Sequence, residues 1–279
     1  MTRLHLQHDC IGVFDSGIGG LTVANAVSSL LPAENLIYIA DNARAPYGRR
    51  TPAEVQQFSR QITDQLLRAG AKLILVACNT ATARAIDQLR LDFPTIPFVG
   101  IEPAVKPAAA ATSSGVIGVL ATQITLGSER YQQLASRYTG ELRVIEDPCI
   151  GLVLKIEAGA SEKELRPFLE DILHPMCAAG ADTIVLGCTH YPLIADQIQA
   201  ICGPAVTLIN PAQATARQLA HVLESKHATV VTAHSPRYDF WATASAYPLE
   251  RSLQQLPNLN RRRALVAGQL LLTGPPDSA

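Results

Sequence analysis

Short apolar runs, many of them β-branched, alternate along the chain with longer segments in which apolar residues recur at helical spacing. The runs lack the alternation of apolar and polar residues that is typical of a strand with one solvent-exposed face. Helical segments lie between them, and together these features predict parallel sheets covered by helices on both faces. Strands are expected at residues 11–14, 36–40, 73–77, 98–100, 116–120, 142–145, 183–187, 206–209 and 229–232. Helices are expected, among other places, at residues 52–69, 161–179 and 212–225. The pattern therefore predicts an α/β protein.

Two stretches of the chain resemble each other. Residues 69–80 read AGAKLILVACNT and residues 179–190 read AGADTIVLGCTH, so that Cys78 and Cys188 fall at the same offset. A second pair, residues 11–16 and 117–122, repeats at a similar separation. Because cysteine is a rare residue, we favour duplication over shared hydrophobic pattern alone, and we expect two related α/β halves.

Each repeated strand is expected to end in a cysteine followed by two polar residues. These triplets are Cys78-Asn79-Thr80 and Cys188-Thr189-His190. Ligands of parallel sheets bind beyond the carboxyl ends of the strands, which is where both triplets are expected. One cysteine alone is more often a small buried hydrophobe, but a pair at related strand ends indicates a functional site.

Two thiols at one site can form a disulfide, bind a metal or move protons. The sequence has no C-x-x-C pair, and only His190 stands near as a further ligand, so redox and metal roles are disfavoured and no metal is expected. A thiol pKa near 8.5 suits general acid–base catalysis. A thiolate on one face of a carbon and a thiol on the other would invert a stereocentre without a cofactor, and no lysine stands in a recognisable pyridoxal phosphate signature.

Two loops supply candidate binding groups. In FDSGIGGLTV, Asp15 and Ser16 follow the first strand, and Asp15 either holds an ammonium group, assists Cys78 or caps the next helix. In ADNARAPYG, Tyr47 and the backbone N–H groups around Gly48 are placed to take a carboxylate. Such neutral donors, with one carboxylate and one histidine, suit a small zwitterionic acid.

Composition narrows the setting of this site. The chain has 279 residues, 48% of them hydrophobic and 17% charged, with a formal net charge of −1. We expect a globular protein with no nucleic-acid partner, and without a long apolar run or a signal core we expect no membrane span and a cytoplasmic location.

The motifs together resemble glutamate racemases of the cofactor-independent aspartate/glutamate racemase superfamily. The resemblance covers about residues 11–232 and rests on the two cysteine motifs in tandem, the Asp-Ser-Gly loop, residues 46–48 and residues 101–104. It implies interconversion of L- and D-glutamate for peptidoglycan synthesis and cell-wall biogenesis, with no cofactor, in a family whose members are often homodimers. It implies Cys78 and Cys188 as the catalytic pair, and substrate contacts by Asp15, Ser16, Tyr47, Gly48, Asn79, Thr80, Thr189 and His190.

The family fold has two similar domains, each a mostly parallel sheet flanked by helices, related by pseudo-twofold symmetry with the active site between them. The resemblance implies a first domain of residues 1–100 plus 211–279 and a second of residues 101–210. It also offers Glu157 as a partner of His190. The chain departs from the family at Ile124 and at Asn210-Pro211, and the tail after Phe240 matches poorly, so partial disorder is expected there.

Three alternatives stay open from the sequence. The first is racemisation or isomerisation of aspartate or another amino acid within the same superfamily. The second is a thiol hydrolase that uses Cys188 with His190 as its base and leaves Cys78 unused. The third is a binding protein that keeps the pocket without catalysis.

Overall fold

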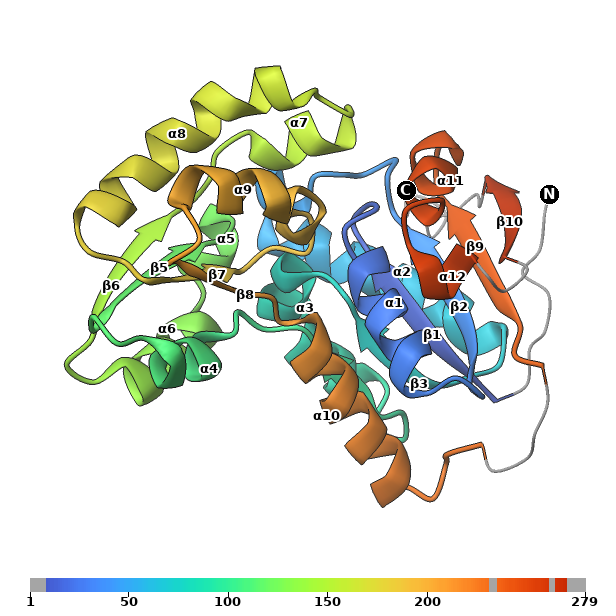
Figure 1. Cartoon of the computed structure of the whole chain (residues 1–279). Helices are drawn as coiled ribbons and strands as arrows, with labels where there is room; N and C mark the ends of the chain where they lie inside the picture. Colours follow the sequence, from blue (N-terminus) through green and yellow to red (C-terminus); the bar gives the residue numbers. More distant parts are fainter. Residues whose placement is uncertain (1–8, 231–234, 261–263, 270–279) are drawn as a thin grey trace, which may run out of the picture. The chain divides into compact units, whose positions relative to one another are not determined.

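The computed structural model describes residues 9–230, 235–260 and 264–269. It divides into two compact units (Figure 1): unit 1 takes the chain up to Ile101 and again from Gln213, and unit 2 takes Glu102–Ala212. Each unit is a parallel β-sheet with flanking helices, which confirms the predicted fold class.

The sheets follow the apolar runs closely. Unit 1 has a six-stranded sheet in the order β10-β9-β2-β1-β3-β4, and unit 2 a four-stranded sheet in the order β6-β5-β7-β8. The strands are β1 Cys10–Asp15, β2 Asn35–Ala40, β3 Ala71–Val76, β4 Phe98–Gly100, β5 Val116–Leu120, β6 Arg143–Asp147, β7 Thr183–Leu186, β8 Thr207–Ile209, β9 Tyr238–Ala242 and β10 Ala264–Gln269.

Helices fill the connections between strands. The α-helices are α1 Leu21–Leu30, α2 Pro52–Arg68, α3 Asn79–Asp92, α4 Val105–Ala111, α5 Gln123–Leu126, α6 Glu129–Thr139, α7 Leu152–Glu157, α8 Glu162–Ala178, α9 Ala195–Cys202, α10 Ala212–Ser225, α11 Tyr247–Leu253 and α12 Pro257–Asn260; two 3₁₀-helices are η1 Tyr47–Arg49 and η2 Tyr191–Ile194. Within the described ranges, no helix has the length and apolar character needed to cross a bilayer.

The second half of the chain repeats the strand order of the first. β2-β1-β3-β4 in unit 1 corresponds to β6-β5-β7-β8 in unit 2. The register repeats as well: Ile11 of β1 lies opposite Leu73 of β3, and their counterparts Ile117 and Thr183 lie opposite each other in β5 and β7. Shared hydrophobic pattern alone does not require a common register, so the repetition supports duplication of a four-stranded unit.

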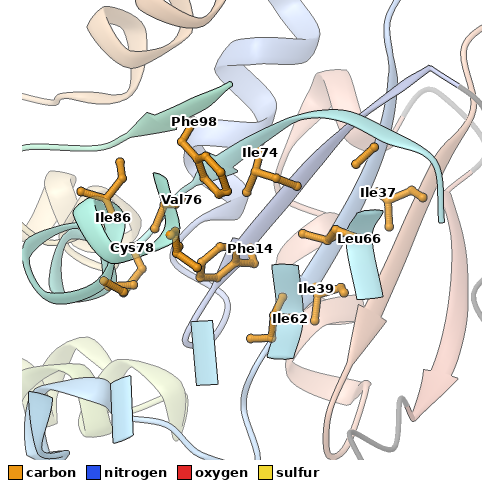
Figure 2. Close-up of a cluster of buried hydrophobic side chains, with 14 of the residues drawn as sticks. Phe14, Ile37, Ile39, Ile62, Leu66, Ile74, Val76, Cys78, Ile86 and Phe98 are labelled. Carbon is orange, nitrogen blue, oxygen red and sulfur yellow. The ribbon is translucent and has the colours of Figure 1, made fainter. Parts of the chain in front are cut away.

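Burial on both faces explains why the strands read as unbroken apolar runs. In unit 1, Phe14, Ile39 and Val76 pack with α2 and α3 in one cluster (Figure 2). In unit 2, Leu186 packs with α7, α8 and α9, whereas Val185 faces α4 and α6 on the opposite side.

One expectation about the end of the chain needs correction. Thr229 and Val230, the start of the strand expected at residues 229–232, lie in no strand, and residues 231 and 232 lie outside the described residues. The sequence instead missed β9, which pairs with β2 and buries Trp241 completely. The part of the tail after Phe240 that the structure describes through residue 260 is regular, with α11 and α12 after β9.

Candidate active site

Cys78 stands at the junction of β3 and α3. It is the N-cap residue of α3 with an extended backbone, and its side chain is only 4% exposed. The thiol donates a hydrogen bond to Ser16 Oγ at 3.7 Å. Figure 2 shows Cys78 beside Ile86 and Val76, within the buried cluster of unit 1. The positive end of the α3 macrodipole favours a negative charge at this position.

Asp15 ends β1, the strand next to β3. The side chain is fully buried, and its Oδ2 accepts a hydrogen bond from the Gly20 N–H at 2.8 Å, so one carboxylate oxygen holds the turn into α1. A Cβ on Gly20 would lie 2.7 Å from the Asp15 Cβ and 2.9 Å from the Ala77 carbonyl oxygen. Only glycine therefore fits where this turn approaches the strand ends.

Asn79 is the clearest sign of a polar ligand. The residue is 3% exposed, and among the described residues neither its Oδ1 nor its Nδ2 has a hydrogen-bond partner. A buried amide without partners is destabilising by about 1–3 kcal/mol, so its presence needs an explanation. A bound polar molecule would supply both missing partners. Thr80 follows it in the first turn of α3 and is also buried.

Tyr47 begins η1, and its ring is buried in the same cluster as Cys78. Its hydroxyl donates to Asp41 Oδ2 at 2.5 Å. Burial and the Asp41 carboxylate raise the pKa of Tyr47 well above its usual value, so the phenol keeps its proton. The sequence expected Tyr47 to offer a donor to a ligand, but this hydroxyl is committed to Asp41, which leaves the backbone around Gly48 for that role.

Asp41 is a residue that the sequence analysis missed. It directly follows β2 and is completely buried. The available signal was an aspartate at the carboxyl end of a third strand, in the same position as Asp15 after β1. Its carboxylate accepts from Tyr47, Arg44 and Thr243, so its charge is fully paired.

The second cysteine lies in unit 2 after β7. Cys188 is 6% exposed and follows Gly187, whose Cβ would lie 2.8 Å from the Leu120 carbonyl oxygen. Thr189 and His190 form a buried turn that leads into η2. After Cys188 the chain forms a turn and a short 3₁₀-helix, and α9 begins only at Ala195.

His190 connects Cys188 to a carboxylate. Its Nδ1 lies 3.8 Å from Cys188 Sγ, and its Nε2 lies 2.5 Å from Glu157 Oε1, which confirms Glu157 as its partner. Burial lowers the pKa of His190, but the hydrogen bonds to Cys188 and Glu157 and their negative charges outweigh it, and the pKa lies well above the usual value. A protonated imidazole therefore lies beside the Cys188 sulfur.

A third thiol lies in the same region of unit 2. Cys149 is buried, its N–H donates to Asp147 Oδ1 at 2.7 Å, and its thiol donates to the Asp147 carbonyl oxygen at 3.5 Å. Burial and the Asp147 charge raise the pKa of Cys149 well above its usual value. Cys149 therefore stays a neutral thiol, unlike a residue that must give and take a proton near pH 7.

The two cysteines occupy equivalent places in the two repeats. The paired part of β3 ends at Val76 and that of β7 at Leu186, opposite Phe14 and Leu120 in the same register, and each cysteine comes two residues later. Unit 1 groups Asp15, Ser16, Asn79 and Thr80 around the strand ends near Cys78. Unit 2 groups His190 and Glu157 around Cys188.

Comparison with known proteins agrees with this arrangement. The family model described as "Asp/Glu/Hydantoin racemase" matches residues 17–219. The chain belongs to the Asp/Glu/hydantoin racemase family. This confirms the resemblance found in the two cysteine motifs, and the match includes both cysteines and most of the site residues around them.

Several racemases of the family are similar over nearly the whole chain. A glutamate racemase from Ectopseudomonas mendocina is 43% identical over 257 residues, which cover 92% of this chain and 96% of the relative. The structure is similar to that of Escherichia coli glutamate racemase in complex with L-glutamate and the activator UDP-MurNAc-ala, with a TM-score of 0.81, 31% identity and coverage of 96% and 100% of the two chains. It is also similar to Francisella tularensis glutamate racemase in complex with D-glutamate, with a TM-score of 0.79, 29% identity and coverage of 95% and 97%.

The departures from the racemase family pattern have local explanations. Ile124 lies inside the short helix α5, and Thr122 caps that helix by accepting the Thr125 N–H at 3.3 Å. Asn210 Oδ1 accepts the Ala212 N–H at 2.9 Å where α10 begins. In both places a side-chain hydrogen bond caps the start of a helix, from Thr122 at α5 and from Asn210 at α10.

Proposed function

We propose that this chain interconverts L-glutamate and D-glutamate without a cofactor, using Cys78 and Cys188 as the two proton carriers. The observation that carries the proposal is the equivalence of the two cysteines: duplicated units hold a nearly buried thiol at the same strand end. Related structures contain L-glutamate in one case and D-glutamate in another, which supports glutamate as the substrate.

In the proposed reaction, Cys188 acts as a thiolate toward L-glutamate. Its sulfur takes the α-hydrogen as a proton, so that an S–H bond forms, the C–H bond breaks and the electron pair remains on the α-carbon. The Cys78 thiol then gives its proton to the opposite face, and D-glutamate results. The reverse reaction begins with Cys78 as thiolate. The His190 imidazolium, held by Glu157, lies beside the Cys188 sulfur.

The remaining groups are proposed to orient the substrate. The amide of Asn79 and the hydroxyls of Thr80, Thr189 and Ser16 offer neutral hydrogen bonds to carboxylate and ammonium groups. Asp15 is the proposed partner of the ammonium group, and the backbone around Tyr47 and Gly48 is proposed to take a carboxylate. His190 is also proposed to contact the substrate.

The proposed physiological role is supply of D-glutamate for peptidoglycan. Such a role places the protein in the cytoplasm, with glutamate as its small-molecule partner and no nucleic-acid or membrane partner. A homodimer is the proposed assembly, by resemblance to the family.

The direct test is incubation of the purified protein with pure L-glutamate and no added cofactor. We expect optical rotation to fall to zero, and in D₂O we expect the product D-glutamate to carry deuterium at the α-position. Folded protein that gives neither signal would refute the proposal. A panel of L-amino acids then separates glutamate from aspartate or another racemase substrate.

A thiol hydrolase is the second candidate, because Cys188, His190 and Glu157 form a connected row of thiol, imidazole and carboxylate. This function does not use Cys78. A Cys78→Ser variant separates the two: a hydrolase would keep its turnover of thioester or amide substrates, whereas a two-cysteine racemase would lose racemisation.

A further inference from the structure

The loop that carries Tyr47 and Gly48 is attached to a segment about two hundred residues away in sequence. Thr243 follows β9, and Asp41 follows β2, its neighbour in the sheet. The Thr243 N–H donates to the Ala40 carbonyl oxygen at 2.9 Å, and the Asp41 N–H donates to the Asp15 carbonyl oxygen at 2.9 Å. Continued pairing beyond the strand ends thus places Asp41 between Asp15 and Thr243.

The Thr243 hydroxyl makes two hydrogen bonds to this loop. It donates to Asp41 Oδ1 at 2.8 Å and accepts the Ala43 N–H at 3.0 Å. Asp41 Oδ2 in turn accepts from the Tyr47 hydroxyl at 2.5 Å and pairs with Arg44 Nε at 2.7 Å. A single hydroxyl therefore joins the start of the loop to the carboxylate that holds its far end.

Asn42 makes a second attachment beside the first. Its Nδ2 donates to the Ser245 carbonyl oxygen at 2.7 Å, and its Oδ1 accepts the Ala244 N–H at 2.8 Å. Both attachments join residues 41–43 to residues 243–245.

We infer that Thr243 is a positioning residue for the substrate: through Ala43, Asp41 and Tyr47 it holds the backbone around Gly48 in place. The inference that this affects catalysis rests on the proposed function, in which that backbone takes a substrate carboxylate. Thr243 acts through the loop, to which its hydroxyl makes both of the hydrogen bonds described above. Its loss should weaken substrate binding more than it slows proton transfer by the two cysteines.

The decisive variant is Thr243→Val, which keeps the shape of the side chain and removes the hydroxyl. The Ala43 N–H and Asp41 Oδ1 then lose a partner, so we expect faster amide hydrogen exchange across residues 41–48. We also expect the KM for glutamate to rise about tenfold, as for one lost positioning hydrogen bond, with kcat changed by less than about twofold. Thr243→Ser keeps the hydroxyl and should restore both properties.

Thr63→Val is the matched control. Thr63 is also buried in unit 1, but its hydroxyl donates to the Ser59 carbonyl oxygen of its own helix, at 2.8 Å. The Thr63→Val variant should leave amide hydrogen exchange across residues 41–48 and the KM for glutamate unchanged. Should Thr243→Val fail to fold, Asn42→Ala at a half-buried position applies the same exchange measurement to the second attachment.

The outcomes separate this inference from the proposed function. The inference is overturned if Thr243→Val shows the same amide hydrogen exchange across residues 41–48, and the same KM, as wild type. Where Asn42→Ala has to replace Thr243→Val, the same result in that variant overturns it. A wild-type protein that does not racemise glutamate would refute the proposed function. In that case the exchange measurement alone still decides whether Thr243 holds the loop.

Discussion

The Nε2 atom of His190 lies 2.5 Å from Oε1 of Glu157, while the other ring nitrogen faces Cys188. His190 is 1% exposed, so little water competes with these two partners. Folding raises the pKa of His190, because the two partners outweigh the effect of burial. A histidine of this kind binds its proton more tightly when folded. The stability that it adds is complete below the ordinary pKa of about 6.5 and is lost as the pH rises through the raised value.

Glu157→Gln should therefore destabilise the protein in a pH-dependent way. We expect the free energy of unfolding to fall by about 3 kcal/mol at pH 6, because a buried ion pair loses its carboxylate. The difference from wild type should shrink as the pH is raised through the elevated pKa of His190, where wild type also loses the charged pair. Urea denaturation at steps from pH 6 to pH 10 measures this, and NMR titration of His190 should show a lower pKa in the variant.

Glu170→Gln is the control for that experiment. Glu170 pairs with Arg166 at 2.9 Å on the surface of α8, where an ion pair contributes at most about 1 kcal/mol. Its effect should be small and almost independent of pH over this range. Parallel pH profiles for Glu157→Gln and wild type would contradict the assigned role of Glu157.

Asn79→Ala should separate stability from binding. Among the described residues the buried amide has no partner, so removing it should raise the free energy of unfolding by about 1 kcal/mol. The KM for glutamate should rise about tenfold or more, since the amide is proposed to bind the substrate. Thermal denaturation and steady-state kinetics on the same preparation measure both effects.

Asn25→Ala is the reciprocal control, because Asn25 Oδ1 accepts the Asn258 N–H at 3.2 Å. This variant should lose stability and keep the wild-type KM. A loss of stability in Asn79→Ala with unchanged KM would show that Asn79 serves the fold rather than a ligand.

Cys78→Ser and Cys188→Ser should each abolish nearly all racemisation. A serine hydroxyl is a far weaker acid than a thiol, and general acid–base catalysis contributes about 10²–10⁴-fold in rate. We expect kcat to fall by about 10³-fold or more in both variants, while calorimetry still detects glutamate binding. Cys177→Ser, at a partly exposed thiol on α8, should retain full activity. Racemisation that survives in either single variant would contradict a two-cysteine reaction.

Gly187→Ala should damage the cysteine loop of unit 2 by overpacking. The added Cβ would lie 2.8 Å from the Leu120 carbonyl oxygen and 3.0 Å from the Ala121 Cβ. We expect about 2 kcal/mol of destabilisation, together with a large loss of kcat because Cys188 is the next residue. Gly127→Ala, whose Cβ would meet one carbonyl oxygen at 3.2 Å, should have a much smaller effect on the melting temperature. Equal melting temperatures for the two variants would contradict the packing argument.

Much of the fold was predictable because both faces of these parallel sheets are buried. Strands β1 to β8 appear in the sequence as apolar runs, and their ends fall within a few residues of the expected ones. β9 was missed because Asp239 interrupts its apolar pattern. In the structure that carboxylate is paired with Arg237 at 3.0 Å, a contact that depends on the folded chain.

For the site, the sequence by itself determined the two cysteines, their polar neighbours and the duplication that relates them. These features are local: a thiol at the end of an apolar run is visible in a dozen residues, and so is its repeat. Tertiary structure decided which groups act on them. Pairing of β2 with β9 brings Thr243 into hydrogen-bond contact with Asp41, and the packing of α7 brings Glu157 into contact with His190. These contacts join segments far apart in the sequence, so only the folded sheet and helices bring them together.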